Sequence, residues 1–238
     1  MNEDKLYIDE KLGDEPFRFD DSVAKVFPDM LRRSIPGYAA SIEAIGSLAA
    51  RYVKNGTNCY DLGCSLGAAT VAMRQGIRAQ DYHIIAVDNS EPMIEHCQTI
   101  LGDDHTIDLR LADIRDVPIE RASMVVMNYT LQFIDVNARD GMVRHIADGM
   151  TDGGLFVLSE KVVDDNAHME ELLVELHHEH KRRNDYSELE ISRKRAALEN
   201  VLVPESVARH RQRLSDAGFS HSAVWLRYFN FVSIVAIK

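Results

Sequence analysis

The sequence of 238 residues has few cysteines and no long apolar run. Its three cysteines, Cys59, Cys64 and Cys97, are odd in number and show no C-x-x-C spacing, which argues against a disulfide framework or a zinc site and indicates reduced thiols. No run of about 18 apolar residues occurs, so no transmembrane helix is expected. The N-terminal segment is acidic and has no apolar centre, so we expect no signal peptide and a cytoplasmic protein.

Basic residues are also scarce, because 27 Lys and Arg stand against 38 Asp and Glu, a formal net charge of -11. Tight non-specific binding to nucleic acid needs a basic surface that displaces counterions, so no direct nucleic-acid partner is expected. With 45% hydrophobic and 27% charged residues, the composition is typical of a soluble globular protein. We expect a flexible N-terminal segment over residues 1–16 and a single domain over residues 17–238.

Short apolar runs alternate with helical patterns through the middle of the chain. This alternation predicts an α/β fold with a mostly parallel, doubly wound, Rossmann-like sheet. The last residues, 221–238, contain two further apolar runs, which we expect to form an antiparallel hairpin. The predicted strands cover residues 58–62, 83–88, 107–113, 123–129 and 154–161, and the helices between them cover residues 68–75, 91–100 and 138–150.

Extra helices are predicted before and after these strands. Residues 19–34 carry apolar residues on one helical face, with Asp20 or Asp21 placed to cap the helix and Pro28 expected to break or bend it. A second helical pattern follows the turn SIPGY. A mostly helical, charged insertion is expected at about residues 164–217.

The stretch DLGCSLG joins the first predicted strand to a helix. Gly63 lets the backbone approach a ligand closely, Gly67 allows tight packing at the helix start, and Asp61 is placed to accept hydrogen bonds from an amine. The spacing resembles the Asp-x-Gly-x-Gly-x-Gly turn of class I S-adenosylmethionine (SAM) methyltransferases, with Ser65 in place of the middle glycine. It does not match the G-x-G-x-x-G turn of dinucleotide enzymes.

Polar residues also end the next three predicted strands. Asp88 is placed to bind the ribose hydroxyls of SAM, and Asp113, beside the Ile114 amide, suits the adenine amino group. Asn128 ends the fourth strand. Each of these residues alone is commonly a helix N-cap, but all of them meet at the carboxyl edge of the sheet, where open α/β sheets bind ligands. Together with Asp61 they predict a SAM site.

Longer stretches resemble the carboxy-S-adenosyl-L-methionine synthase family from about residue 17 to the C-terminus. They are FDDSVAKVFPDMLRRSIPGY, YDLGCSLGAAT, VDNS, DIRD, NYTLQF and HHEHKRRNDYSELEISRKRAALENV. The resemblance implies a methyltransferase-like fold that converts SAM and prephenate to carboxy-SAM and phenylpyruvate, with SAM as substrate. It also implies a homodimer, and a downstream enzyme that uses the product to build 5-oxyacetyl uridine at the tRNA wobble position.

The same resemblance implies roles for individual residues. Arg195, in SRKR, matches the arginine that pairs with the new carboxylate, a contact that a bidentate guanidinium suits; without the resemblance it would simply be a solvated residue. Tyr38 lies against the ligand and, with Arg195, is a candidate catalytic residue. The resemblance assigns no residues to prephenate, and it leaves open whether Arg195 serves its own pocket or a neighbour's. The matched ligand-binding residues are Tyr38, Asp61, Gly63, Cys64, Ser65, Asp88, Asn89, Asp113, Ile114, Asn128 and Arg195.

Two other functions stay open. A small-molecule methyltransferase, with Arg195 gripping an anionic acceptor, would yield S-adenosylhomocysteine. A non-catalytic SAM-binding subunit of a tRNA-modifying complex would bind without turnover. Of His177, His178 and His180, only the first and third share a helical face, so we expect a solvated, partly packed helix and no metal. Cys64 has no evident His partner and is not expected to be a nucleophile.

Overall fold

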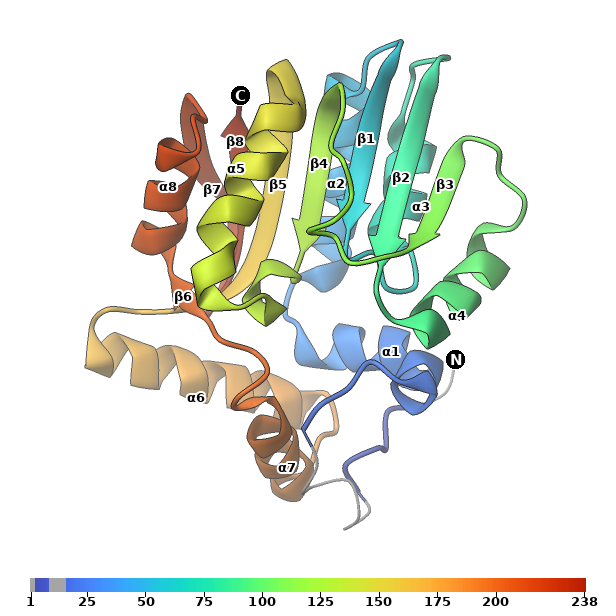
Figure 1. Cartoon of the computed structure of the whole chain (residues 1–238). Coiled ribbons are helices and arrows are strands. Elements are labelled where there is room, and N and C mark those ends of the chain that lie inside the picture. Colours follow the sequence, from blue (N-terminus) through green and yellow to red (C-terminus); the bar gives the residue numbers. More distant parts are fainter. Residues whose placement is uncertain (1–2, 9–15) are drawn as a thin grey trace.

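A computed structural model describes residues 3–8 and 16–238. Its sheet has the strand order β3-β2-β1-β4-β5-β8-β7, with the short strand β6 paired to β5 (Figure 1). Strands β1 to β5 run parallel, and β8 is antiparallel to both β5 and β7. The predicted Rossmann-like fold with a C-terminal hairpin is confirmed. The strands are β1 (Thr57–Leu62), β2 (Tyr82–Asp88), β3 (Ile107–Leu111), β4 (Ala122–Asn128), β5 (Met150–Val163), β6 (Glu205–Ser206), β7 (His221–Tyr228) and β8 (Phe231–Ile237).

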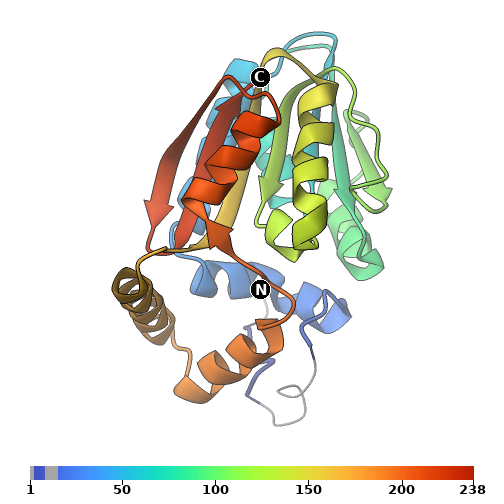
Figure 2. The ribbon, with the colours of Figure 1, turned by 60° about the vertical axis from the view of Figure 1, so that its left-hand side comes forward.

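Helices cover both faces of the sheet and the edge at which the parallel strands end. Helices α2 and α3 lie on one face, and α5 and α8 lie on the other (Figures 1 and 2). The helices are α1 (Asp21–Ser34), α2 (Tyr38–Tyr52), α3 (Ala68–Gly76), α4 (Glu91–Leu101), α5 (Arg139–Gly149), α6 (Ala167–Arg183), α7 (Glu188–Leu198) and α8 (Val207–Asp216), with short 3-10 turns η2 (Leu131–Phe133) and η3 (Val136–Ala138).

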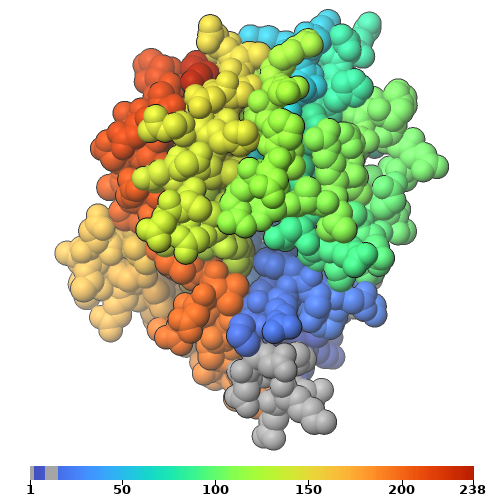
Figure 3. Space-filling view, in the orientation of Figure 1, coloured from blue at the N-terminus to red at the C-terminus, as the bar shows by residue number. Residues whose placement is uncertain are grey.

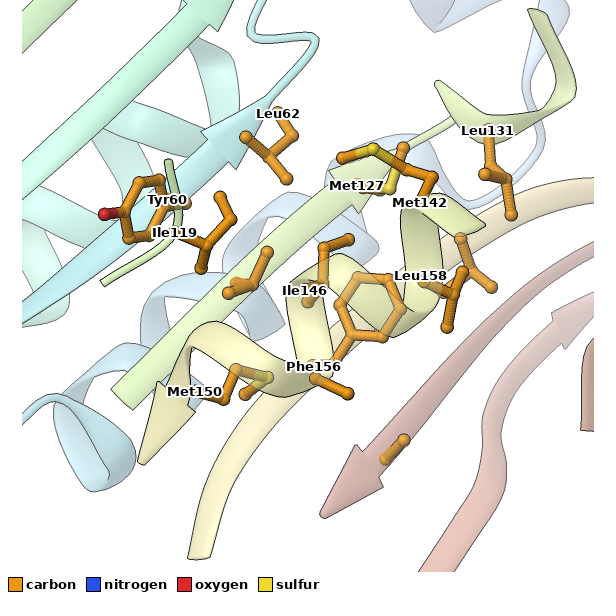
Figure 4. Packing of buried hydrophobic residues seen from close by; sticks show 14 of the residues in the cluster. Tyr60, Leu62, Ile119, Met127, Leu131, Met142, Ile146, Met150, Phe156 and Leu158 are labelled. Atoms are coloured by element: carbon orange, nitrogen blue, oxygen red, sulfur yellow. The ribbon is translucent and has the colours of Figure 1, made fainter. Parts of the chain in front are cut away.

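The central strands are buried on both faces, which is why they are continuous apolar runs in the sequence. Figure 4 shows Tyr60 and Leu62 of β1 on the same side as Met142 and Ile146 of α5. The opposite face of the sheet packs against α2 and α3, with Ile45 fully buried there. The sheet is therefore a rigid support for the loops at its carboxyl edge.

A separate layer of helices lies beyond that edge. Figures 1 and 3 show α1, α6 and α7 gathered past the carboxyl ends of β1, β2 and β4. Helix α1 begins where predicted, because the Asp20 side chain accepts a hydrogen bond from the Val23 amide at 3.0 Å. Of the break or bend expected at Pro28, the break is wrong, since α1 continues through this residue. The predicted insertion at 164–217 contains α6, α7, β6 and α8.

Three further expectations need correction. The third strand ends at Leu111, so Asp113 lies in the turn that follows it. The fifth strand is longer than predicted: β5 also includes residues 150–153 before the predicted strand and residues 162–163 after it. Residues 3–8 are not a loose tail: Asp4 and Tyr7 are buried against the helical layer. The rest of the predicted flexible segment, apart from Pro16, lies outside the described residues.

Within residues 3–8 and 16–238, no helix combines the length and apolar character that crossing a membrane requires.

Candidate active site

A cavity of about 420 Å³ lies between the carboxyl edge of the sheet and the helical layer. Its volume is in the range typical of small-molecule sites. Ten of the eleven predicted ligand-binding residues line it, and the exception is Arg195. The ten are Tyr38, Asp61, Gly63, Cys64, Ser65, Asp88, Asn89, Asp113, Ile114 and Asn128.

The loop after β1 has a backbone that favours glycine. Gly63 and Gly67 have φ angles of +84° and +79°, and Ser65 has a φ of +47°, all in the left-handed region. A Cβ on Gly63 would lie 2.4 Å from the Thr130 Oγ1, and one on Gly67 would lie 2.9 Å from the Cys97 Sγ. Ser65 therefore adopts a conformation that costs an L-residue about 1–2 kcal/mol, which explains why glycine is usual at this position.

Two carboxylates from β1 and β2 face the cavity. The Thr70 hydroxyl donates a hydrogen bond of 2.6 Å to buried Asp61, and burial raises the pKa of Asp61 to about 6. Asp88 accepts hydrogen bonds of 2.9 Å from the amides of Ser65 and Ser90, and burial raises its pKa as well. Asp88 thus holds the glycine loop and the start of α4 in place beside any ligand contact it makes.

Asp113, in the turn after β3, and Asn128, at the end of β4, differ in whether their side chains already have a hydrogen-bond partner. The Arg115 guanidinium donates a hydrogen bond of 2.9 Å to Asp113, and this contact lowers the pKa of Asp113. The Asn128 Oδ1, in contrast, is buried and accepts no hydrogen bond from any described residue. A buried acceptor without a donor is costly, so Asn128 fits a site in which a bound ligand supplies an N–H or O–H group.

Aromatic rings form a continuous apolar wall of the cavity. Tyr38, the first residue of α2, lies 6.4 Å from Tyr129 between ring centroids, and Tyr129 lies 5.9 Å from Phe231. Burial raises the pKa of both tyrosines, which keeps the phenols neutral. Tyr38 is therefore a hydrogen-bond donor and packing surface, not an anionic base.

Sequence reasoning missed the basic residues of this cavity. Lys161, His177, Lys181 and Lys194 also line it. His177 is the packed member of the predicted histidine cluster, and its Nε2 is 2.9 Å from the Ser34 carbonyl oxygen. Burial lowers the His177 pKa to about 2, so the neutral ring donates this hydrogen bond. The spacing of His177 and Lys181, four residues apart on α6, was the available signal.

Arg195 is exposed on α7 and does not line the cavity of its own chain. Its charge is nevertheless close enough to lower the pKa values of Lys161 and Lys181. Cys64 is buried, and the neighbouring Cys97 thiol together with burial raises the Cys64 pKa well above its ordinary value, so the thiol is neutral. Among the residues that the structure describes, no three His, Cys, Asp or Glu side chains are grouped as metal ligands.

Comparisons with known proteins agree on fold and family. A family model described as a methyltransferase domain matches residues 60–154. The chain is 50% identical to a carboxy-S-adenosyl-L-methionine synthase of Shewanella oneidensis, covering 100% of this chain and 99% of the relative. It is 52% identical to the synthase of Trichlorobacter lovleyi, with 93% of each chain covered.

Solved structures of lower identity share the fold. A putative O-methyltransferase of Nostoc punctiforme matches with a TM-score of 0.64 at 18% identity, covering 92% of this chain and 59% of the other. A putative SAM-dependent methyltransferase of Methanococcus maripaludis matches with a TM-score of 0.59 at 22% identity, covering 94% of this chain and 96% of the other.

Proposed function

This chain belongs to the carboxy-S-adenosyl-L-methionine synthase family, and from that membership we propose that it converts SAM and prephenate to carboxy-SAM and phenylpyruvate. The chain is an enzyme of the transferase class with a SAM-binding methyltransferase fold. The observation that carries the proposal is the full-length likeness to these synthases, in a chain whose cavity gathers ten of the eleven residues matched to the family.

The proposed reaction balances without a strong base from the protein. Prephenate loses carbon dioxide and hydroxide as its ring becomes aromatic, leaving phenylpyruvate. The hydroxide removes a proton from the SAM methyl group, which the sulfonium acidifies, and forms water. The resulting ylide carbon bonds to the carbon dioxide, so the products are carboxy-SAM, phenylpyruvate and water.

The protein would hold the two substrates next to each other and keep water away from the reacting groups. The Asp61 carboxylate would accept from the SAM ammonium group, Asp88 from the ribose hydroxyls, and the orphan Asn128 Oδ1 from a ligand donor. Tyr38, Tyr129 and Phe231 form an apolar surface on which carbon dioxide can be kept from solvent.

Arg195 would pair with the new carboxylate, as the family match implies. Because Arg195 is exposed in its own chain, the contact requires movement of α7 or a second copy of the chain. A homodimer fits the large apolar side chains exposed on α6 and α7, which are Met169, Leu172 and Leu189. We also propose a cytoplasmic location and a downstream tRNA-modifying enzyme that uses carboxy-SAM at the wobble uridine.

Mass spectrometry of the purified protein tests the proposal. We expect a bound molecule heavier than SAM by one carbon dioxide, formed in vitro only when prephenate accompanies SAM and lost in Arg195→Ala. S-adenosylhomocysteine with no heavier species would instead indicate a methyltransferase with a small anionic acceptor. Bound SAM without any turnover would indicate a non-catalytic subunit.

A further inference from the structure

Four basic side chains line the cavity but lie outside the strand ends that carry the predicted SAM residues. Lys161 lies near the end of β5, His177 and Lys181 lie one turn apart on α6, and Lys194 lies on α7. We call these four residues the basic wall. The SAM contacts matched to the family, which come from β1, β2, β4, the turn after β3 and the start of α2, leave the basic wall without a role.

The residues of the basic wall differ in whether an acidic side chain already pairs with them. Lys194 is paired with Asp4, Nζ to Oδ2 at 3.4 Å, and donates to the Ser34 hydroxyl at 3.1 Å. Lys161 and Lys181, in contrast, form no ion pair with any residue of the described ranges. Burial lowers the pKa of both, that of Lys181 to about 7. The nearby charges of Lys194, Lys161 and Arg195 lower the Lys181 pKa further, whereas the Glu170 carboxylate raises the Lys161 pKa. Ammonium groups buried in this way favour a bound anion.

Aromatic rings connect the basic wall to the SAM side of the cavity. His177 lies 4.8 Å from Phe231 between ring centroids, and the row continues through Tyr129 to Tyr38. A ligand that spans this distance needs an anionic end for the lysines and an apolar ring for the aromatic wall. A carboxylate attached to a carbocyclic ring has both of these parts.

We propose that Lys161 and Lys181 form a carboxylate subsite that holds the second substrate, an anionic carbocycle, by the carboxylate it keeps through the reaction. The inference rests on the proposed function and assigns residues to its unassigned substrate. A cation on the departing carboxylate would stabilise the charged reactant more than neutral carbon dioxide, and so would slow the loss of carbon dioxide. The lysines therefore bind the retained carboxylate, and the departing one lies toward the SAM methyl group.

Equilibrium binding to protein loaded with S-adenosylhomocysteine tests the subsite without turnover, because this ligand has no sulfonium methyl group. The probes are prephenate, which carries both carboxylates, and phenylpyruvate, which carries only the retained one. We expect Lys161→Met and Lys181→Met each to weaken both probes by about 10- to 100-fold, as loss of a charge-assisted contact does. Binding of S-adenosylhomocysteine itself should change by less than about twofold, which also shows that the variants are folded.

Lys54→Met is the matched control, because Lys54 is exposed between α2 and β1 and does not line the cavity. Equal binding of both probes to all variants would overturn the subsite. Weaker prephenate binding with unchanged phenylpyruvate binding would overturn the assignment to the retained carboxylate.

A separate turnover assay with SAM and prephenate distinguishes failure of the subsite from failure of the proposed function. Lysine-dependent binding in a wild-type protein that makes no carboxy-SAM would keep the subsite and reject the function. Carboxy-SAM synthesis by the wild-type protein, together with probe binding that does not depend on the lysines, would keep the proposed function and reject the subsite.

Discussion

At the scale of single residues, Gly63 is constrained both by its backbone and by its neighbour. Its φ is +84°, and a Cβ would lie 2.4 Å from both Oγ1 and Cγ2 of Thr130. We expect Gly63→Ala to lower the free energy of unfolding by about 3 kcal/mol, since left-handed strain and overpacking add. Urea denaturation measures it. Gly141→Ala is the control: Gly141 lies in α5 with open space around its Cα, so alanine should raise stability by up to about 1 kcal/mol.

We expect the affinity for SAM to depend on pH through Asp61. Burial raises its pKa to about 6, so the Asp61 carboxyl takes up a proton as the pH falls from 7 to 5. Only ionised Asp61 accepts a strong hydrogen bond from the SAM ammonium group, which stays protonated below pH 7. We expect the Kd for SAM to rise about tenfold between pH 7 and pH 5, measured by calorimetry. Asp61→Asn should flatten this dependence, and an unchanged slope in that variant would contradict the assignment.

The strand-end residues could be predicted from the sequence because each depends on a local pattern. Asp61 and Asp88 follow apolar runs and precede helices, so their position at the sheet edge follows from the alternation alone. Lys161 ends the predicted strand 154–161, so its place at the sheet edge also follows from the alternation. Lys194 has no such pattern, because it reaches the cavity only where α7 folds back over the sheet edge, which is a long-range event.

At the scale of elements, local sequence patterns predict the strands of the sheet, whereas the packing of the helical layer depends on long-range contacts. The strands are buried on both faces and are strongly apolar, so their existence and order of appearance were predictable. Pro28 does not break α1 because one missing amide hydrogen bond does not end a helix that packs Phe27 and Met30 into a core. The packing of residues 3–8 was missed because an acidic segment carries no periodic signal.

Asp4 ties this segment to the helical layer. Its carboxylate lies 3.4 Å from the Lys194 Nζ and accepts a hydrogen bond from the Tyr186 hydroxyl, and its amide donates to Asp29 at 2.8 Å. Removing the carboxylate leaves Lys194 buried without its anion. We expect Asp4→Ala to lower the free energy of unfolding by about 3 kcal/mol, measured by urea denaturation.

Glu3→Ala is the matched control for Asp4→Ala. Among residues 3–8 and 16–238, the Glu3 carboxylate forms only an exposed ion pair with Lys5, so this change should alter stability by less than about 0.5 kcal/mol. Equal, small effects in the two variants would mean that residues 3–8 do not stabilise the fold.

At the scale of the whole molecule, the helical layer exposes large apolar side chains. Leu189 is 53% exposed on α7, the helix that carries the exposed Arg195. Met169 and Leu172 of α6 are also exposed, and α6 and α7 lie at the same end of the molecule (Figure 1). An apolar surface of this kind beside an unused arginine fits a second copy of the chain that covers the helices and receives the guanidinium.

Complementation between two inactive variants tests whether Arg195 serves the neighbouring cavity. In a mixed dimer of Arg195→Ala and Asp88→Ala chains, the cavity of the Arg195→Ala chain keeps Asp88 and would receive Arg195 from its partner. Random assembly makes half the dimers mixed, each with one complete site, so co-expression should restore about one quarter of wild-type carboxy-SAM synthesis. Each variant alone should be inactive. If Arg195 serves its own cavity, every site in the mixture lacks one residue and the activity stays absent. Restored activity, in contrast, would show that Arg195 on α7 completes the cavity of the neighbouring chain.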